Sequence, residues 1–280
     1  MKTFIVPTDF SINAQHASSY AMQLAQQLEA RILLMHAYEE PVAVSEYELS
    51  SIHFDTMKEH ILKRLEERKH ELQEAYGSKT PIEYVACNNN LIGHIRKLYE
   101  KHDARLVIIG LTGAGMANFF LGSNTLNIVN EVGHPVITVP PHAPFRPIRK
   151  VVFACDMKDV ARSVPAEKIK KILQVVHAEL LVINIRHPRT SEEETENEKA
   201  TLEKMLQGIP FSFHSISKKN ITAGIKDFVR QQDADLIMII PKKHDFLNTL
   251  IHASHTKAML FRSSVPIMTI PMEAELQPEK

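Results

Sequence analysis

The chain contains an internal repeat, and this feature constrains its fold more than any other. "TFIVPTDFS" (3–11) corresponds to "VVFACDMKD" (151–159), with Asp9 matching Asp156. "ARILLMHAYE" then corresponds to "AELLVINIRH", "DARLVIIG" to "DADLIMII" and "GHPVITVP" to "SVPIMTIP", in the same order in both halves. An ordered repeat indicates two copies of one structural unit. The proline-rich stretch 141–150 is typical of a linker, and we place the two domains at residues 1–143 and 147–272.

Each half alternates short apolar runs with helical patterns. In the first half we expect strands near 2–8, 31–37, 82–87, 105–110 and 135–139, and helices near 12–29, 50–75, 91–102 and 123–132. Near-continuous apolar runs are typical of parallel strands that are covered on both faces. With right-handed crossovers, the pattern predicts the α/β class, with two tandem doubly wound five-stranded parallel-sheet domains. Gly77 is expected to end the helix at 50–75, and the acidic run "SEEETENEK" (191–199) favours the first turn of a helix.

Composition excludes several classes of function. The 280 residues are 44% hydrophobic and 24% charged, which is enough for two globular domains. A formal net charge of +0 gives no global attraction to nucleic acid or to an anionic membrane. No apolar run reaches the roughly 18 residues of a membrane span, and the N-terminus resembles a first strand more than a signal peptide. The two cysteines, Cys87 and Cys155, cannot form a disulfide framework, which favours the cytoplasm.

A glycine-rich stretch, "VIIGLTGAGMANFFLGSNTLNIV" (107–129), is the first candidate site. Gly110 ends the fourth expected strand, and Gly122-Ser123 open the next helix. Ligands of open α/β sheets bind beyond the carboxyl ends of the strands, where the strand order reverses. Glycine lets a ligand approach the backbone, and helix N-terminal amides suit phosphate. Asp9 would lie near the same crevice, where its carboxylate could bind a sugar or base, or hold Mg²⁺. Two alternatives stay open: the glycines serve only the turn, and Asp9 only caps a helix.

The motifs "VPTDFS", "LLMHA" and "GLTG…LGSNT" together resemble the universal stress protein (UspA) family, over nearly the whole chain as two tandem copies. The resemblance implies a Rossmann-like fold of the adenine nucleotide alpha hydrolase type, a role in stress response and a homodimer of chains. In one branch it implies ATP binding through G-x₂-G-x₉-G-[ST]. Only eight residues separate Gly113 from Gly122, one fewer than the motif has. The residues that the resemblance places at the nucleotide are Pro7, Thr8, Asp9, Ala37, Gly110, Gly113, Gly122, Ser123, Asn124 and Thr125.

The charges near this stretch favour a binding function over catalysis. No lysine or arginine occurs from Leu106 to Phe145, so a triphosphate would depend on backbone amides, the helix dipole and a metal ion. No cation from this stretch would stabilise a phosphoryl-transfer transition state. We therefore expect a regulatory protein that acts through unidentified protein partners and has at most weak ATPase activity. The alternative is a slow Mg-dependent ATP hydrolase, or a binder of another anionic ligand or metal through the second domain.

The second copy has lost the glycines. In "LIMIIPKKHDFLNTLIHASHTKAM" (236–259), Ile240 or Pro241 stands in place of Gly110, and Ala253-Ser254 in place of Gly122-Ser123. We therefore expect nucleotide binding in the first domain alone. The basic segment 242–257 holds His244, His252 and His255, which invites a zinc interpretation. A solvated basic loop is favoured instead, because the chain carries 15 histidines and clusters of them arise by chance.

Overall fold

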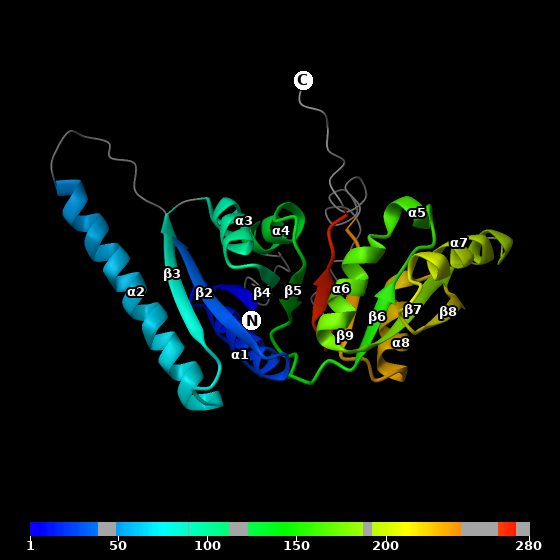
Figure 1. The fold of residues 1–280 in the computed structure, drawn as a ribbon, viewed down its shortest axis with the longest axis horizontal. Helices are drawn as coiled ribbons and strands as arrows, with labels where there is room; N and C mark the ends of the chain where they lie inside the picture. Colours follow the sequence, from blue (N-terminus) through cyan, green and yellow to red (C-terminus); the bar gives the residue numbers. More distant parts are fainter. Residues whose placement is uncertain (39–48, 89, 112–122, 187–191, 242–262, 273–280) are drawn as a thin grey trace, which may run out of the picture. The chain divides into compact units, whose positions relative to one another are not determined.

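The computed structural model describes residues 1–38, 49–88, 90–111, 123–186, 192–241 and 263–272. The chain separates into two compact units, Met1–Pro141 and His142–Lys280, each with its own run of parallel strands (Figure 1). No helix within the described ranges is both long and apolar enough to cross a membrane.

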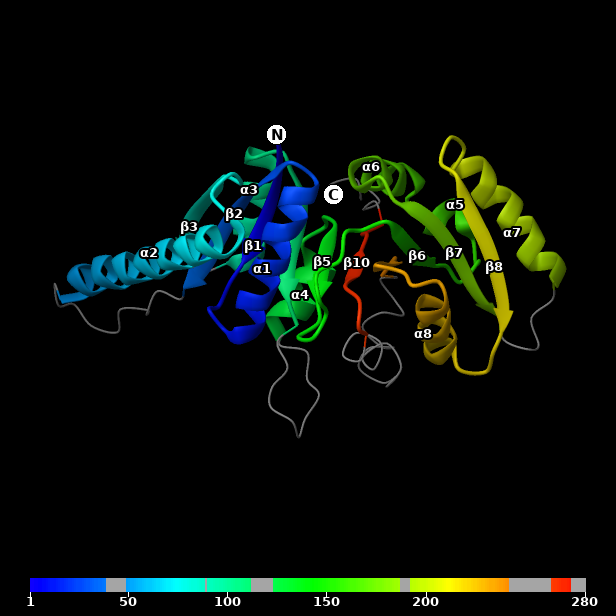
Figure 2. The same cartoon turned by 90° about the horizontal axis from the view of Figure 1, so that it is seen from below.

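The first unit contains β1 (Lys2–Pro7), β2 (Ala30–Tyr38), β3 (Ile82–Asn88), β4 (Ala104–Gly110) and β5 (Val136–Val139), in the order β3-β2-β1-β4-β5. All of these pairings are parallel. Its helices are α1 (Ile12–Gln27), α2 (Leu49–Tyr76), α3 (Leu91–Lys101) and α4 (Ser123–Glu131). Helices α1 and α2 contact each other on one face of the sheet (Figure 2), and α3 contacts α4. In the sheet, β1 has β2 on one side and β4 on the other, so the strand order reverses between β1 and β4.

The core of the first unit follows from its apolar runs. Phe4, Ile5 and Val6 of β1 are fully buried, as expected for a central strand covered on both faces. Helix α2 buries Leu65 and Leu72 at helical spacing. It ends where predicted, because Gly77 takes a φ of +89° and its N–H donates to the carbonyl of Gln73 at 2.8 Å.

The second unit repeats this arrangement. Its strands are β6 (Lys150–Ala154), β7 (Glu179–Arg186), β8 (Phe211–Ser217), β9 (Leu236–Ile239) and β10 (Ile267–Thr269), in the order β8-β7-β6-β9-β10. This is the order of the first unit, strand for strand, and it confirms the predicted fold class. The acidic run lies in α7 (Glu192–Met205), as expected, and α8 (Ile221–Gln231) precedes β9.

The first helix of the second unit is broken, which the sequence analysis did not predict. The helix that corresponds to α1 is divided into α5 (Val160–Ser163) and α6 (Ala166–Val176). Pro165 lies at the break, where its missing N–H and fixed φ prevent a continuous helix. Val164 before it is extended, with φ −111° and ψ 112°, as a residue that precedes proline prefers.

The expected linker, 141–150, is attached to the second unit. Arg146 forms two hydrogen bonds of 2.7 Å with the carboxylate of Asp233. The backbone N–H groups of Arg149 and Lys150 donate to Oδ2 of Asp235, at 2.9 and 3.0 Å. The two units divide between Pro141 and His142, and the domain limits 1–143 and 147–272 stay a prediction.

Candidate functional site

The carboxyl ends of β1, β2 and β4 meet where the strand order reverses. In register, Pro7 pairs with Met35 of β2, and Ile5 of β1 pairs with Val107 of β4. The predicted residues Pro7, Thr8, Asp9, Ala37 and Gly110 therefore lie at one edge of the sheet. Pro7, Asp9 and Ala37 are at least partly exposed, whereas Thr8 and Gly110 are buried.

Thr8 is held inside the turn that follows β1. Its N–H donates to the Met35 carbonyl at 2.8 Å, and its hydroxyl oxygen accepts from the N–H of Phe10 at 3.0 Å. Nδ1 of His36 lies 2.7 Å from the Thr8 carbonyl oxygen. With the side chain only 7% exposed, the threonine hydroxyl shapes the turn. His36 was not among the predicted site residues, although it directly follows the buried run of β2.

Asp9 combines a local role with an exposed charge. Its Oδ1 accepts from the N–H of Ser11 at 3.0 Å, and Ser11 in turn caps α1 by accepting from the N–H of Ala14 at 3.2 Å. Among the described residues, no group of three or more His, Cys, Asp or Glu side chains could hold a metal ion. Mg²⁺ is often bound by one or two carboxylates together with phosphate oxygens, and Asp9 could hold it in this way.

Gly110 is required by the packing of the first unit. A Cβ atom added there would lie 2.4 Å from the carbonyl oxygen of Asn13 and 2.7 Å from its carbonyl carbon. The end of β4 thus approaches the backbone of the first turn of α1. Thr125, which is buried, also contacts this strand end, donating from Oγ1 to the Gly110 carbonyl at 3.4 Å. The missing side chain at Gly110 has a structural cause whether or not a ligand binds.

Several predicted positions lie outside what the structure describes. Gly113 and Gly122 are outside the described residues, and Ser123 and Asn124 are described only as the first residues of α4. In the second unit, the histidine- and lysine-rich segment 242–257 and Ala253-Ser254 also lie outside the described residues. The favoured solvated basic loop, its zinc alternative and the expected loss of nucleotide binding in the second unit therefore stay untested.

Two arginines of α2, neither of them predicted from the sequence, support the β1–α1 turn and the first turns of α1. The guanidinium of Arg64 lies 4.0 Å from the centre of the Phe10 ring, and that ring packs against His36 at 4.7 Å. Phe10 has a φ of 62°, a left-handed conformation that a bulky residue rarely adopts. The contacts from Arg64 and His36 hold Phe10 beside Asp9.

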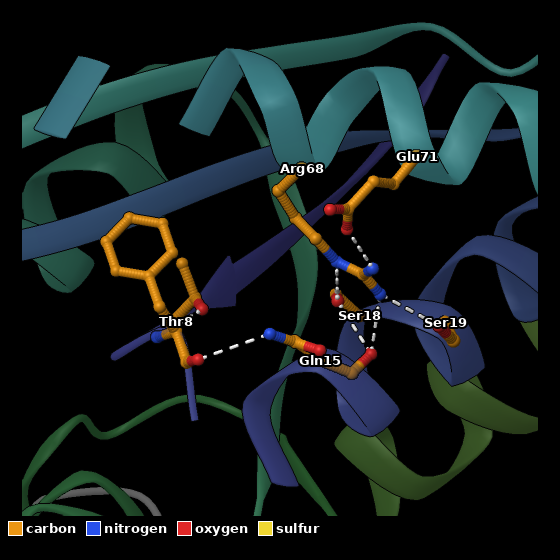
Figure 3. A network of polar contacts seen from close by, with 7 residues as sticks. Thr8, Gln15, Ser18, Ser19, Arg68 and Glu71 are labelled. Carbon is orange, nitrogen blue, oxygen red and sulfur yellow. Dashed lines mark hydrogen bonds and ion pairs between the residues drawn. The ribbon is translucent and has the colours of Figure 1, made fainter. Parts of the chain in front are cut away.

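Arg68 joins α2 to the first turns of α1 (Figure 3). Its Nε donates to Oγ of Ser18 at 3.0 Å, and its Nη2 donates to the Gln15 carbonyl at 2.7 Å and to Oγ of Ser19 at 2.8 Å. Nη1 forms an ion pair with Glu71 at 2.7 Å. A sequence signal existed, since Arg64 and Arg68 are four residues apart and so share one face of a helix.

The second unit repeats the geometry of this turn with different side chains. The N–H of Cys155 donates to the Ile183 carbonyl at 3.0 Å, and Nδ2 of Asn184 donates to the Cys155 carbonyl at 3.0 Å. Met157 has a φ of 53°, like Phe10, and Oδ1 of Asp156 accepts from the N–H of Lys158 at 3.3 Å. Cys155 thus corresponds to Thr8 and Asn184 to His36. The backbone of the turn is retained while its chemistry is changed.

The first unit matches a known family. The family model of the universal stress proteins matches residues 1–140. The chain belongs to the universal stress protein family. A universal stress protein from Archaeoglobus fulgidus DSM 4304 has a solved structure similar to this one, with a TM-score of 0.71 and 18% identity over 96% of this chain and 98% of that chain. The Archaeoglobus universal stress protein thus shares the two-unit fold along its whole length.

One further solved structure agrees in fold over most of the chain. A functionally unknown protein from Pseudomonas aeruginosa PAO1 matches with a TM-score of 0.56 and 12% identity, over 97% of this chain and 93% of that chain. A universal stress protein in complex with cAMP matches with a TM-score of 0.39 and 22% identity. The match covers 49% of this chain and 96% of that chain. At that score the likeness says nothing about this chain's ligand. No curated protein sequence matches the chain significantly.

Proposed function

We propose that the first unit binds ATP or a related adenine nucleotide and that this universal stress protein is a cytoplasmic regulator of a stress response. One observation carries the proposal most directly. In a chain whose residues 1–140 match the family, the carboxyl ends of β1 and β4 lie side by side at the reversal of strand order, which is where open α/β sheets bind their ligands.

The residues present fit a nucleotide. Asp9 offers an exposed carboxylate to a ribose, a base or a phosphate-bound Mg²⁺, and the half-exposed Ala37 offers its backbone to the edge of an adenine ring. Helix α4 begins at Ser123, directly after the Gly122 position, so its first amides are available to phosphate. Thr8 and Thr125 have buried side chains and would act by holding the two strand ends in place.

Binding in the first unit alone is supported by the contrast between the two units. After β9 the backbone continues through Ile240 and Pro241, and proline has no N–H to offer to a phosphate. In the first unit the corresponding position, at the end of β4, is Gly110. Together with Ala253-Ser254 in place of Gly122-Ser123, this difference leads us to propose one nucleotide per chain.

The test compares Gly122→Val with Ala253→Val at the corresponding position. Gly122→Val places a β-branched side chain where phosphate should approach the backbone. It should weaken ATP binding at least tenfold, or about 1.4 kcal/mol, while Ala253→Val should leave the affinity unchanged. Calorimetric titration with ATP and Mg²⁺ should give one site per chain. Two equal sites would refute the asymmetry, and no binding at millimolar ATP would mean that the shortened loop has closed the site.

Melting temperatures and turnover complete the test. A ligand at about 100 times its dissociation constant stabilises a protein by roughly 2.7 kcal/mol, so ATP should raise the melting temperature of the wild type and of Ala253→Val but not of Gly122→Val. We expect turnover under excess ATP and Mg²⁺ to stay at background. A measurable rate that Gly122→Val abolishes would support the slow hydrolase instead.

We further propose that the protein acts as a homodimer through protein partners. The proposal comes from the family to which residues 1–140 belong. Light scattering over a wide range of concentration should give twice the 31.8 kDa of one chain. A constant mass of one chain would exclude the homodimer.

A further inference from the structure

A cavity lies along the edge of the sheet in the first unit, where Cys87 of its lining pairs in register with Ala37 of the predicted nucleotide site. Its volume is about 460 Å³, within the range of small-molecule sites. It is lined by Tyr38 at the end of β2, by residues 85–88 of β3, by one face of α3 and by Lys58 of α2. Strand β3 is the outermost strand of this unit's sheet, with α2 and α3 both packed against it (Figure 1). The lining shares no residue with the predicted nucleotide site.

The charge of this cavity is positive. Lys58, Lys97 and Lys101 line it, and none of the described residues that line it is acidic. Lys97 and Lys101 are four residues apart, so they lie on the same face of α3. All three lysines are exposed, and none forms an ion pair with a carboxylate in the described part of the chain. Three like charges around one cavity repel each other, and an anion between them would relieve that repulsion.

The remaining wall is mostly apolar. Val85, Ala86 and Leu98 contribute hydrocarbon, and Tyr38 contributes a ring. Burial raises the pKa of the Cys87 thiol, so this side chain stays neutral near pH 7 and does not oppose an anion. His94 is held by a contact of 2.9 Å between its Nε2 and the Asn88 carbonyl. An apolar wall with cations at its rim suits a molecule that has an apolar body and an anionic head.

We propose that this cavity between β3, α2 and α3 binds a small amphiphilic anion, whose apolar body contacts Val85 and Leu98 and whose phosphate or carboxylate group is bound by Lys58, Lys97 and Lys101. The proposed site uses none of the residues predicted for the nucleotide site. It would let one domain respond to a second class of ligand, because α3 connects β3 directly to β4, the strand that ends at Gly110.

The experiment uses three probes with the same apolar body, 1-naphthyl phosphate, 1-naphthoate and 1-naphthol, titrated into the full-length protein in the presence of saturating ATP. We expect the phosphate or the carboxylate to bind at least tenfold more tightly than the neutral alcohol, and the better of the two identifies the head group. Equal affinities for all three probes would overturn the proposal, because the lysines would then contribute nothing. Competition between ATP and the better anion would also overturn it, because the probe would then occupy the nucleotide site.

Matched variants locate the site. Lys97→Gln with Lys101→Gln should weaken binding of the better anion at least tenfold, and Leu98→Asp should also weaken it by placing a carboxylate in the cavity. Lys63→Gln with Lys79→Gln removes the same charge from two exposed lysines outside the cavity and should change nothing. An equal loss in both double variants would show non-specific attraction and refute the site. Gly122→Val should leave the anion affinity unchanged, so that failure of the nucleotide proposal and failure of this one are distinguished.

Discussion

A methyl group added at Gly110 would lie 2.4 Å from the Asn13 carbonyl oxygen, a contact that real Cβ atoms essentially never make. Because the obstacle is the backbone of α1, it cannot rotate away. We expect Gly110→Ala to lower the free energy of unfolding by about 1–3 kcal/mol, as overpacking in a core does. Chemical denaturation without nucleotide measures this directly.

Gly93→Ala is the comparison for Gly110→Ala. A Cβ atom at Gly93 would meet only the side chain of Asn90, with its Nδ2 at 2.4 Å, and this side chain can move. The loss should therefore be smaller than at Gly110. If Gly110→Ala is harmless without ATP but weakens ATP binding, then the glycine is there for the ligand and our structural explanation is wrong.

The pair between Arg146 and Asp233 makes one carboxyl group unusually acidic. The hydrogen bonds from Arg146 lower the pKa of Asp233, and the positive charge of Arg146 adds to the effect. A folded pKa below the unfolded value means that the stabilisation is present above the unfolded pKa and is lost as the pH falls through the folded pKa. Arg146→Met should raise the pKa of Asp233 towards its ordinary value, measured by an NMR titration of the side-chain carboxyl.

Asp227 is the internal control for that titration. Its pKa is also lowered, chiefly by the hydrogen bond from Lys218, and Arg146→Met should leave it unchanged. Both carboxylates are exposed, so solvent screens these pairs and their contribution to stability is small. A similar rise at both residues would point to a general change in the second unit and not to the loss of one partner.

At the scale of elements, Arg68 is the main polar connection between α2 and α1. Its side chain is only 13% exposed and donates to the Gln15 carbonyl and to two serine hydroxyls. Arg68→Met should lower the free energy of unfolding by about 2–3 kcal/mol, because hydrogen bonds from a charged donor are lost together. It should also speed hydrogen exchange in α2 more than in α3.

Glu71→Gln provides the control for Arg68→Met. It removes only the ion pair between Arg68 and an exposed carboxylate, so its cost should stay below about 1 kcal/mol. If Glu71→Gln costs as much as Arg68→Met, the ion pair and not the contacts to α1 holds the two helices together.

The elements themselves were predictable because their signals are local. Each apolar run became a strand, and Gly77 ended α2 at the expected residue. The division of the second unit's first helix at Pro165 had an equally local signal, which the repeat with α1 concealed. The meeting of Asp9 and Gly110 at one sheet edge followed from topology alone. The inward hydroxyl of Thr8, the Arg68 contacts and the approach of Gly110 to Asn13 depend on packing between distant segments, which no sequence pattern specifies.

At the scale of the whole molecule, the expected linker, residues 141–150, is held by contacts with the second unit. Ala143 and Ile148 are buried, Arg146 contacts Asp233 and Asp235, and the carboxylate of Asp235 accepts two backbone N–H groups while only 6% exposed. A buried carboxylate that accepts several hydrogen bonds fixes the backbone that donates them. The proline-rich composition suggested a linker, yet these contacts hold residues 146–150 against the second unit.

This attachment should control proteolysis. Trypsin must draw the backbone around Arg149 into an extended form, and in the native protein the N–H groups of Arg149 and Lys150 are bound to Asp235. Asp235→Ala leaves them without their acceptor and frees Arg146 from one partner, so cleavage after Arg149 should be at least tenfold faster than in the wild type. That factor corresponds to about 1.4 kcal/mol of local opening, within the range expected when a buried hydrogen-bond acceptor is removed. Asp227→Ala removes a carboxylate of the same unit whose partners among the described residues are the side chains of Lys218 and Arg230. It should leave the rate of cleavage after Arg149 unchanged. Wild-type protein that is cut after Arg149 as quickly as Asp235→Ala would show that the contacts to Asp235 do not hold this segment, and that the two units are joined by a free linker after all.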